Sequence, residues 1–138
     1  MPKHVLVVDG QGGRIGRALA ERLAARTDPE NPAFVLTVVG ANALATANMM
    51  KGASFARGAT GENAAVVNAA RADVIAGPIG IILADAMLGE ITPAVRVLVP
   101  MNRTQCDNYV VGVRDDPLSV LLDEAADAVI RFLGEQKP

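Results

Sequence analysis

A glycine-rich segment near the amino terminus has the residue types and the spacing needed to bind a phosphate through the backbone. Glycine lets bare N–H groups approach a diphosphate, and a helix that begins after such a turn directs the positive end of its dipole toward the same anion. The segment also satisfies the spacing Gly-x-x-Gly-x-x-Gly. We therefore predict that it binds the phosphates of a nucleotide through Gly10, Gln11, Gly12, Gly13, Arg14, Ile15 and Gly16. A second interpretation, in which the glycines serve only helix–strand packing, stays open.

The residues after the second apolar run bear on the identity of the nucleotide. Dinucleotide-binding domains place an acid there to hold the adenosine ribose diol, but this chain has Gly40-Ala41-Asn42. Asn42 is predicted to contact the cofactor instead, and the planar fork of Arg14 suits a ribose 2′-phosphate. These features favour NADP over NAD, although NAD remains a candidate. In the alternative interpretation, Arg14 is a solvated residue of the first helical turn and contacts no cofactor.

Polar and glycine residues recur after the later strands that we expect. Thr60 is the predicted N-cap of a helix, and Arg103 comes after a further strand. Because parallel strands end at one edge of a sheet, these segments should lie near the glycine-rich segment. The additional predicted cofactor contacts are Thr60, Gly61, Asn63, Gly77, Pro78 and Arg103.

Groups for acid–base catalysis are few. Glu62 and Glu90 are weak catalytic candidates, and Asp9 is expected to cap the turn that it precedes. His4 begins the first strand, so we place it at the end of the sheet opposite the expected crevice. Cys106 has no histidine base beside it in the sequence.

Short β-branched runs alternate with helical patterns along the chain. Strands are predicted at 5–8, 34–39, within 54–59, and at 74–76, 95–99 and 109–113, with helices near 15–25, 42–51, 60–72 and 79–88. A final helix should begin at Asp116-Pro117 and bury a stripe made of Leu118, Leu121, Leu122, Ala125, Val129 and Phe132. This alternation predicts an α/β fold in which residues 1–138 form a single doubly wound, mainly parallel sheet with helices on both faces, a Rossmann-like nucleotide-binding domain.

Composition excludes several other classes of protein. The chain has 138 residues with a formal net charge of -2, one His, one Cys and no Trp. It therefore predicts no metal site, no nucleic-acid partner and no disulfide. The most apolar stretch, residues 74–88, is too short and interrupted for a membrane span, and the first residues of the sequence show no signal-peptide pattern. We expect a cytoplasmic protein, and the apolar segment 79–88 suggests either a buried helix or a homo-oligomer interface.

Four motifs together resemble a known family. They are Asp9-Gly10-Gln11-Gly12-Gly13, Gly58-Ala59-Thr60-Gly61-Glu62-Asn63, Gly77-Pro78-Ile79-Gly80-Ile81 and Met87-Leu88-Gly89-Glu90-Ile91-Thr92-Pro93. With these motifs the chain resembles a bacterial family of small proteins known only as a domain of unknown function. The resemblance implies a Rossmann-like nucleotide-binding fold and no established activity.

The glycine-rich segment is also similar to that of short-chain dehydrogenases. Those enzymes use a Tyr with a Lys four positions later, whereas Tyr109 has Val113 at that distance. The sequence thus favours an NADP- or NAD-binding module without a complete catalytic set. Two alternatives remain. One is a small enzyme acting on a phosphorylated or carboxylated metabolite, with Glu62 or Glu90 as acid–base and Arg103 as anion clamp. The other is a structural homo-oligomer.

Overall fold

The computed structural model describes residues 2–78 and 116–135. The strands are β1 (Lys3–Asp9), β2 (Phe34–Gly40), β3 (Arg57–Thr60) and β4 (Val74–Ala76), and the helices are α1 (Arg14–Ala24), α2 (Ala43–Met50), α3 (Glu62–Ala69) and α6 (Leu118–Glu135). The four strands and four helices coincide, within a few residues, with those predicted for these parts of the chain. The elements predicted at 79–88, 95–99 and 109–113 lie outside the described residues.

The four strands form one sheet in which all pairs are parallel, in the order β3-β2-β1-β4. The α/β class with a parallel sheet is therefore confirmed, and the order equals that of the first four strands of a Rossmann fold. Asp9, Gly40 and Thr60 pair in one row, so β1, β2 and β3 end level with one another. The strand order reverses between β1 and β4, and ligands of open α/β sheets bind beyond the strand ends at such a point.

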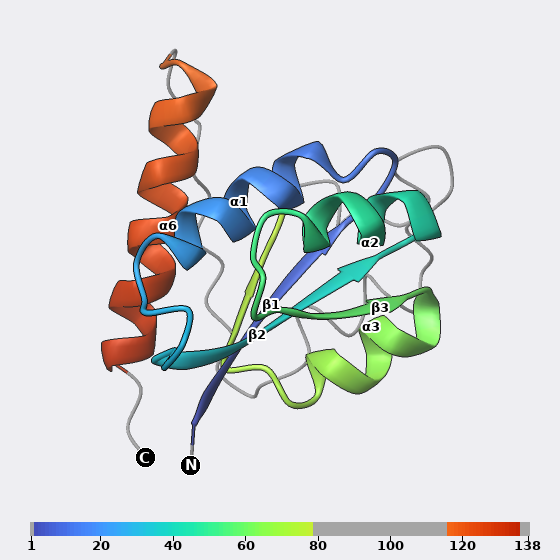
Figure 1. Ribbon diagram of the computed structural model, residues 1–138, viewed down its shortest axis with the longest axis horizontal. Helices are drawn as coiled ribbons and strands as arrows, with labels where there is room; N and C mark the ends of the chain where they lie inside the picture. The colour runs from blue at the N-terminus through green and yellow to red at the C-terminus, as the bar shows by residue number, and fades with distance from the viewer. Residues whose placement is uncertain (1, 79–115, 136–138) are drawn as a thin grey trace.

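Successive residues of the strands pack against different helices, as the alternation of side chains along a strand requires. Val5, Val7 and Leu36 join the cluster that includes residues of α1, α2 and α6, whereas Leu6 and Val8 join a smaller cluster with the alanines of α3. Figure 1 shows α1 and α2 over one side of the sheet and α3 beneath the other. Since β1 contributes to both clusters, its central residues are buried almost completely.

Helix α6 packs beside α1 (Figure 1). Its buried residues are Leu122, Ala126, Ala128 and Val129. The prediction that Leu118 belongs to the buried stripe is wrong, because the first turn of α6 extends past α1 and leaves Leu118 58% exposed. No helix within residues 2–78 and 116–135 combines the length and apolar character that crossing a membrane would require.

Ion pairs at the rim of this contact join α1 and the turn after it to α6. Arg22 lies 3.2 Å from Asp123, and Arg26 lies 2.8 Å from Asp127. The hydrogen bond that Arg26 donates to Asp127 raises the pKa of Arg26 above its usual value. Both carboxylates are more than half exposed, so each pair contributes only about 0–1 kcal/mol, and the apolar contact holds α6 in place.

Candidate functional site

Asp9, the last residue of β1, organises the start of the glycine-rich segment. Its side chain is only 4% exposed. One carboxylate oxygen accepts the N–H of Gly10 and the other accepts the N–H of Gly16, each at 2.7 Å. The Gly16 amide is one of the first N–H groups of α1, which have no acceptor within the helix. Asp9 therefore caps the turn and the helix together, in agreement with its predicted role.

The glycine-rich segment turns sharply between β1 and α1. Its two residues with positive φ are Gln11 at 49° and Gly13 at 70°. The chain therefore changes direction at Gln11 and Gly13, and not at Gly10. The N–H of Gly13 donates to the carbonyl of Gly10 at 2.9 Å, and Gly13 forms the N-cap of α1. The segment is thus a closed turn that leads directly into the helix.

Two asparagines from α2 and its N-cap hold this turn from the side. The Asn42 carboxamide donates to the carbonyl of Gln11 at 3.0 Å, while its oxygen caps α2 by accepting the N–H of Ala45. Asn48 donates to the carbonyl of Gly12 at 2.8 Å. The structure therefore brings Asn42 to the glycine-rich segment as expected, although the contact shown is to the backbone. Sequence reasoning missed Asn48, because no sequence pattern links a residue within α2 to a turn 36 residues earlier.

The glycines of the turn have different steric surroundings. A Cβ atom on Gly13 would lie 2.6 Å from the carbonyl oxygen of Ala45, and one on Gly16 would collide with Met49 and Asp9. Gly12 differs, since a Cβ there would meet no atom of the described residues within 4 Å, and its φ is not positive. Packing therefore explains Gly13 and Gly16 but does not explain Gly12.

Some N–H groups of the turn remain for a ligand. Because the Gln11 carbonyl points to Asn42 and a trans peptide directs its N–H the opposite way, the Gly12 N–H points away from Asn42. Within the described part of the chain, the structure shows no acceptor for the N–H of Gly12, Arg14 or Ile15. The last two are the first N–H groups of α1, where the positive end of the helix dipole lies.

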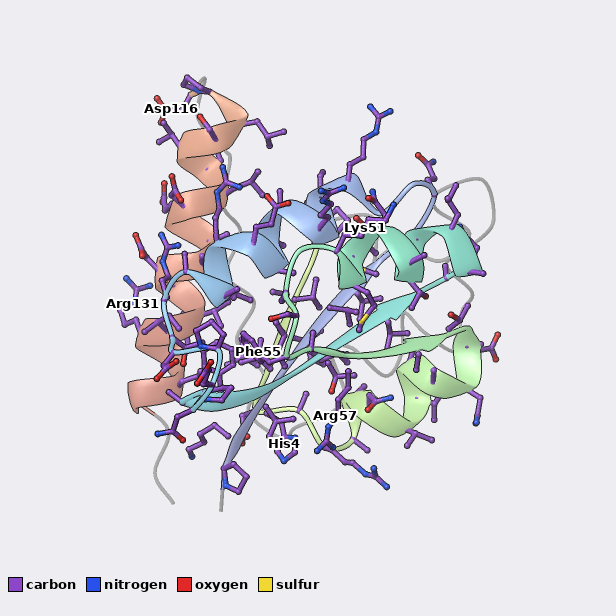
Figure 2. The ribbon with its side chains drawn as sticks, in the orientation of Figure 1. His4, Lys51, Phe55, Arg57, Asp116 and Arg131 are labelled. Atoms are coloured by element: carbon purple, nitrogen blue, oxygen red, sulfur yellow. The ribbon has the colours of Figure 1, made fainter. Side chains whose placement is uncertain are left out.

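A groove between α1 and α2 opens beside Gly12. Its lining residues include Arg14, Arg17, Lys51, Glu21 and the 70% exposed Leu44. Arg17 forms an ion pair with Glu21 at 3.0 Å, which leaves the charges of Arg14 and Lys51 in excess. Figure 2 shows Lys51 at the carboxyl-terminal side of α2. The groove therefore carries a net positive charge next to the turn.

The turn after β3 lies at the same edge of the sheet as the ends of β1 and β2. The prediction that Thr60 caps the next helix is wrong, because the N-cap of α3 is Gly61, with φ at 99° and no side-chain cap. Thr60 instead lies 2.7 Å from the hydroxyl of Thr46, a hydrogen bond that joins β3 to α2. Glu62 and Asn63 are exposed in the first turn of α3, so both lie at the predicted edge of the sheet.

Some of the remaining predicted site residues are described by the structure, and others are not. Gly77 and Pro78 come after β4, the strand beside β1, and are partly buried. Glu90, Arg103 and Cys106 lie outside the described residues. His4 lies at the first residues of β1, at the end of the sheet opposite the glycine-rich turn, as predicted (Figure 2).

Comparison with known proteins places most of this chain in one family. The model of the family described as "Domain of unknown function (DUF3842)" matches residues 4–133. No curated protein and no solved structure matches the chain.

Proposed function

The chain belongs to the DUF3842 family, and we propose that this member is a nucleotide-binding module that takes NADP or NAD at the turn after β1, without a complete catalytic set of its own. The observation that carries the proposal is Gly12. A Cβ atom on Gly12 would meet no described atom within 4 Å, the φ of Gly12 is not positive, and its N–H is directed away from α2. A ligand that approaches the backbone closely accounts for such a glycine, and packing does not.

The position of the turn supports the same proposal. It comes directly after β1, the strand at which the strand order reverses, and it leads into α1. A diphosphate at this point would accept the N–H groups of Gly12, Arg14 and Ile15 near the positive end of the helix dipole. Asp9 already occupies the N–H groups of Gly10 and Gly16, so these two amides serve the turn and not the ligand.

The charge of the neighbouring groove favours NADP over NAD. Arg14 and Lys51 line it without an acidic partner among the described residues. The 2′-phosphate that distinguishes NADP is a dianion, for which the guanidinium fork of Arg14 has the right donor geometry. Asn42, which stands where NAD-binding proteins carry an acid, caps α2 and holds the turn.

Binding is tested by replacing Gly12 with aspartate. The new carboxylate would lie beside the diphosphate, so we expect the stabilisation of the protein by NADP to disappear while the melting temperature of the free protein stays within a few degrees of the wild type. Thermal shift and calorimetric titration with NADP and NAD measure both quantities. The matched control is Gly134→Asp, which places the same charge at another open glycine, on α6.

Two results would oppose the proposal. If the wild-type protein binds no adenine nucleotide or coenzyme, the proposed function is wrong. If Gly12→Asp binds NADP as tightly as the wild type does, the nucleotide lies elsewhere and the open glycine has another cause. Gly13 is unsuitable for this test, because any side chain there would strike the backbone of α2.

The preference for NADP depends on Arg14. Replacement of Arg14 by glutamine should weaken NADP binding about tenfold, since one charge-assisted contact to the 2′-phosphate is lost, and should leave NAD binding nearly unchanged. Isothermal titration with the two cofactors at one ionic strength gives the ratio. An equal loss for both cofactors would instead assign Arg14 to the diphosphate.

A further inference from the structure

A second concave site lies on the same sheet, at the end opposite the glycine-rich turn. Its floor comes from three adjacent strands, because Leu6 of β1 pairs with Thr37 of β2, and Thr37 pairs with Arg57 of β3. Paired residues of parallel strands face the same side, and Leu6 lies in the cluster with α3. His4, two residues before Leu6, faces that side as well.

The end of α3 forms the wall of this site. The helix begins after the carboxyl end of β3 and leads to the start of β4, so it runs opposite to the strands. Asn68 in its last turn and Arg71 just after it therefore lie over the beginnings of β1 and β3. The result is a pocket of about 130 Å³, which we call the Arg57–Arg71 pocket, lined by His4, Thr37, Arg57, Asn68 and Arg71 among others.

The polar lining is cationic. Arg57 and Arg71 contribute two guanidinium groups and His4 an imidazole, whereas none of the lining residues within 2–78 and 116–135 is acidic. The carboxylate of Asp73 accepts the backbone N–H of His4 at 2.7 Å and does not line the pocket. The carbonyl end of α3 offsets only about half an elementary charge, so the pocket keeps an excess of positive charge.

The two arginines also have no partner among the described side chains. Within residues 2–78 and 116–135, neither Arg57 nor Arg71 forms an ion pair or donates a side-chain hydrogen bond. Figure 2 shows His4 and Arg57 at the lower end of the sheet, away from the turn that comes after β1. Two unpaired guanidinium forks in one concavity are suited to a single anion that accepts from both.

We propose that the Arg57–Arg71 pocket binds a compact oxyanion of the phosphate class. Its volume of about 130 Å³ is well below the roughly 300–1,000 Å³ of typical small-molecule sites, which suits a single phosphate group better than a whole nucleotide. A phosphate dianion matches the two arginine charges. The source is either free inorganic phosphate or the terminal phosphate of a small metabolite, and the site is independent of the nucleotide site proposed above.

The test is an NMR titration of the ¹⁵N-labelled full chain with inorganic phosphate, at an ionic strength held constant with sodium chloride. We expect saturable shifts of amide signals around His4, Arg57 and Arg71. The double variant Arg57→Gln/Arg71→Gln should lose saturation, and Arg71→Gln alone should weaken binding about tenfold. Arg131→Gln, which removes one charge from the exposed side of α6, is the matched control and should behave as the wild type.

A parallel titration with methyl phosphate distinguishes the two sources. Binding of both probes indicates a terminal phosphate group, and binding of inorganic phosphate alone indicates the free ion. Arg57→Lys keeps the positive charge but removes the planar guanidinium group, so it should bind phosphate with intermediate affinity. This variant replaces the double variant in the experiment if the double variant does not fold. Shifts that sodium chloride reproduces, or that persist unchanged in the folded double variant, would overturn the proposal.

Discussion

Replacing Asp9 with alanine is expected to lower the free energy of unfolding by about 4 kcal/mol, because two buried N–H groups would each lose a charged acceptor. Those groups belong to Gly10 and Gly16, and the carboxylate that accepts both is 4% exposed. The lost interaction with the start of α1 adds to the effect. Urea unfolding monitored by circular dichroism measures the change.

Asp28→Ala is the matched control for this experiment. The Asp28 side chain is exposed, and among the described residues its carboxylate accepts only a local N–H, that of Glu30. Its removal should change the free energy of unfolding by less than about 1 kcal/mol. Asp9→Asn gives a further comparison, since the amide offers one acceptor where the carboxylate offers two, and its loss should lie between those of the other variants. Equal stability of Asp9→Ala and the wild type would show that the carboxylate does not organise the turn.

The second large effect is expected for Gly13→Ala, with a loss of about 3 kcal/mol, the sum of backbone strain and a steric clash. An alanine at φ 70° is strained by about 1–2 kcal/mol. Its methyl group would also lie 2.6 Å from the carbonyl oxygen of Ala45 and 2.9 Å from the Ala45 α-carbon, and overpacking of this kind costs about 1–3 kcal/mol. Since both obstructing atoms belong to the backbone of α2, the helix itself would have to move.

Gly12→Ala tests this explanation with the same substitution one residue earlier. The new methyl group would meet no described atom within 4 Å, and the φ of this residue is not positive. Its free energy of unfolding should therefore stay within about 0.5 kcal/mol of the wild type or rise slightly. If both variants lost equal stability, the loss in Gly13→Ala could not be explained by its contact with the backbone of α2.

Much of the fold could be predicted from local sequence patterns. The apolar run at Val5–Val8 and the alternation with helical segments indicate buried parallel strands, and the strands and helices of the described residues appear where they were expected. Their ends were less predictable. The Thr60 side chain was assigned to the N-cap of α3 from its type alone, but its hydroxyl pairs with Thr46 of α2, a contact that depends on how β3 meets that helix.

In the candidate site, too, local sequence features were predicted and contacts between distant segments were not. The glycine spacing and its place after the first strand marked the turn, and Asp9 was expected to cap it. Asn48 was not predicted, since its contact to Gly12 depends on the docking of α2 beside α1. The Arg57–Arg71 pocket was also not predicted from the sequence, because it combines residues of three strands with the end of a helix that comes later in the chain.

The sequence by itself determined the class of fold and the position of the glycine-rich turn, because buried β-branched runs, helical periodicity and glycine spacing are local properties of the chain. Only the tertiary structure decided what each glycine does. Gly13 and Gly16 are required by the atoms of α2 and Asp9 that lie against them, whereas no described atom lies against the Cβ position of Gly12. That distinction depends on the distance between segments far apart in the chain, and such a distance exists only after the helices have packed on the sheet.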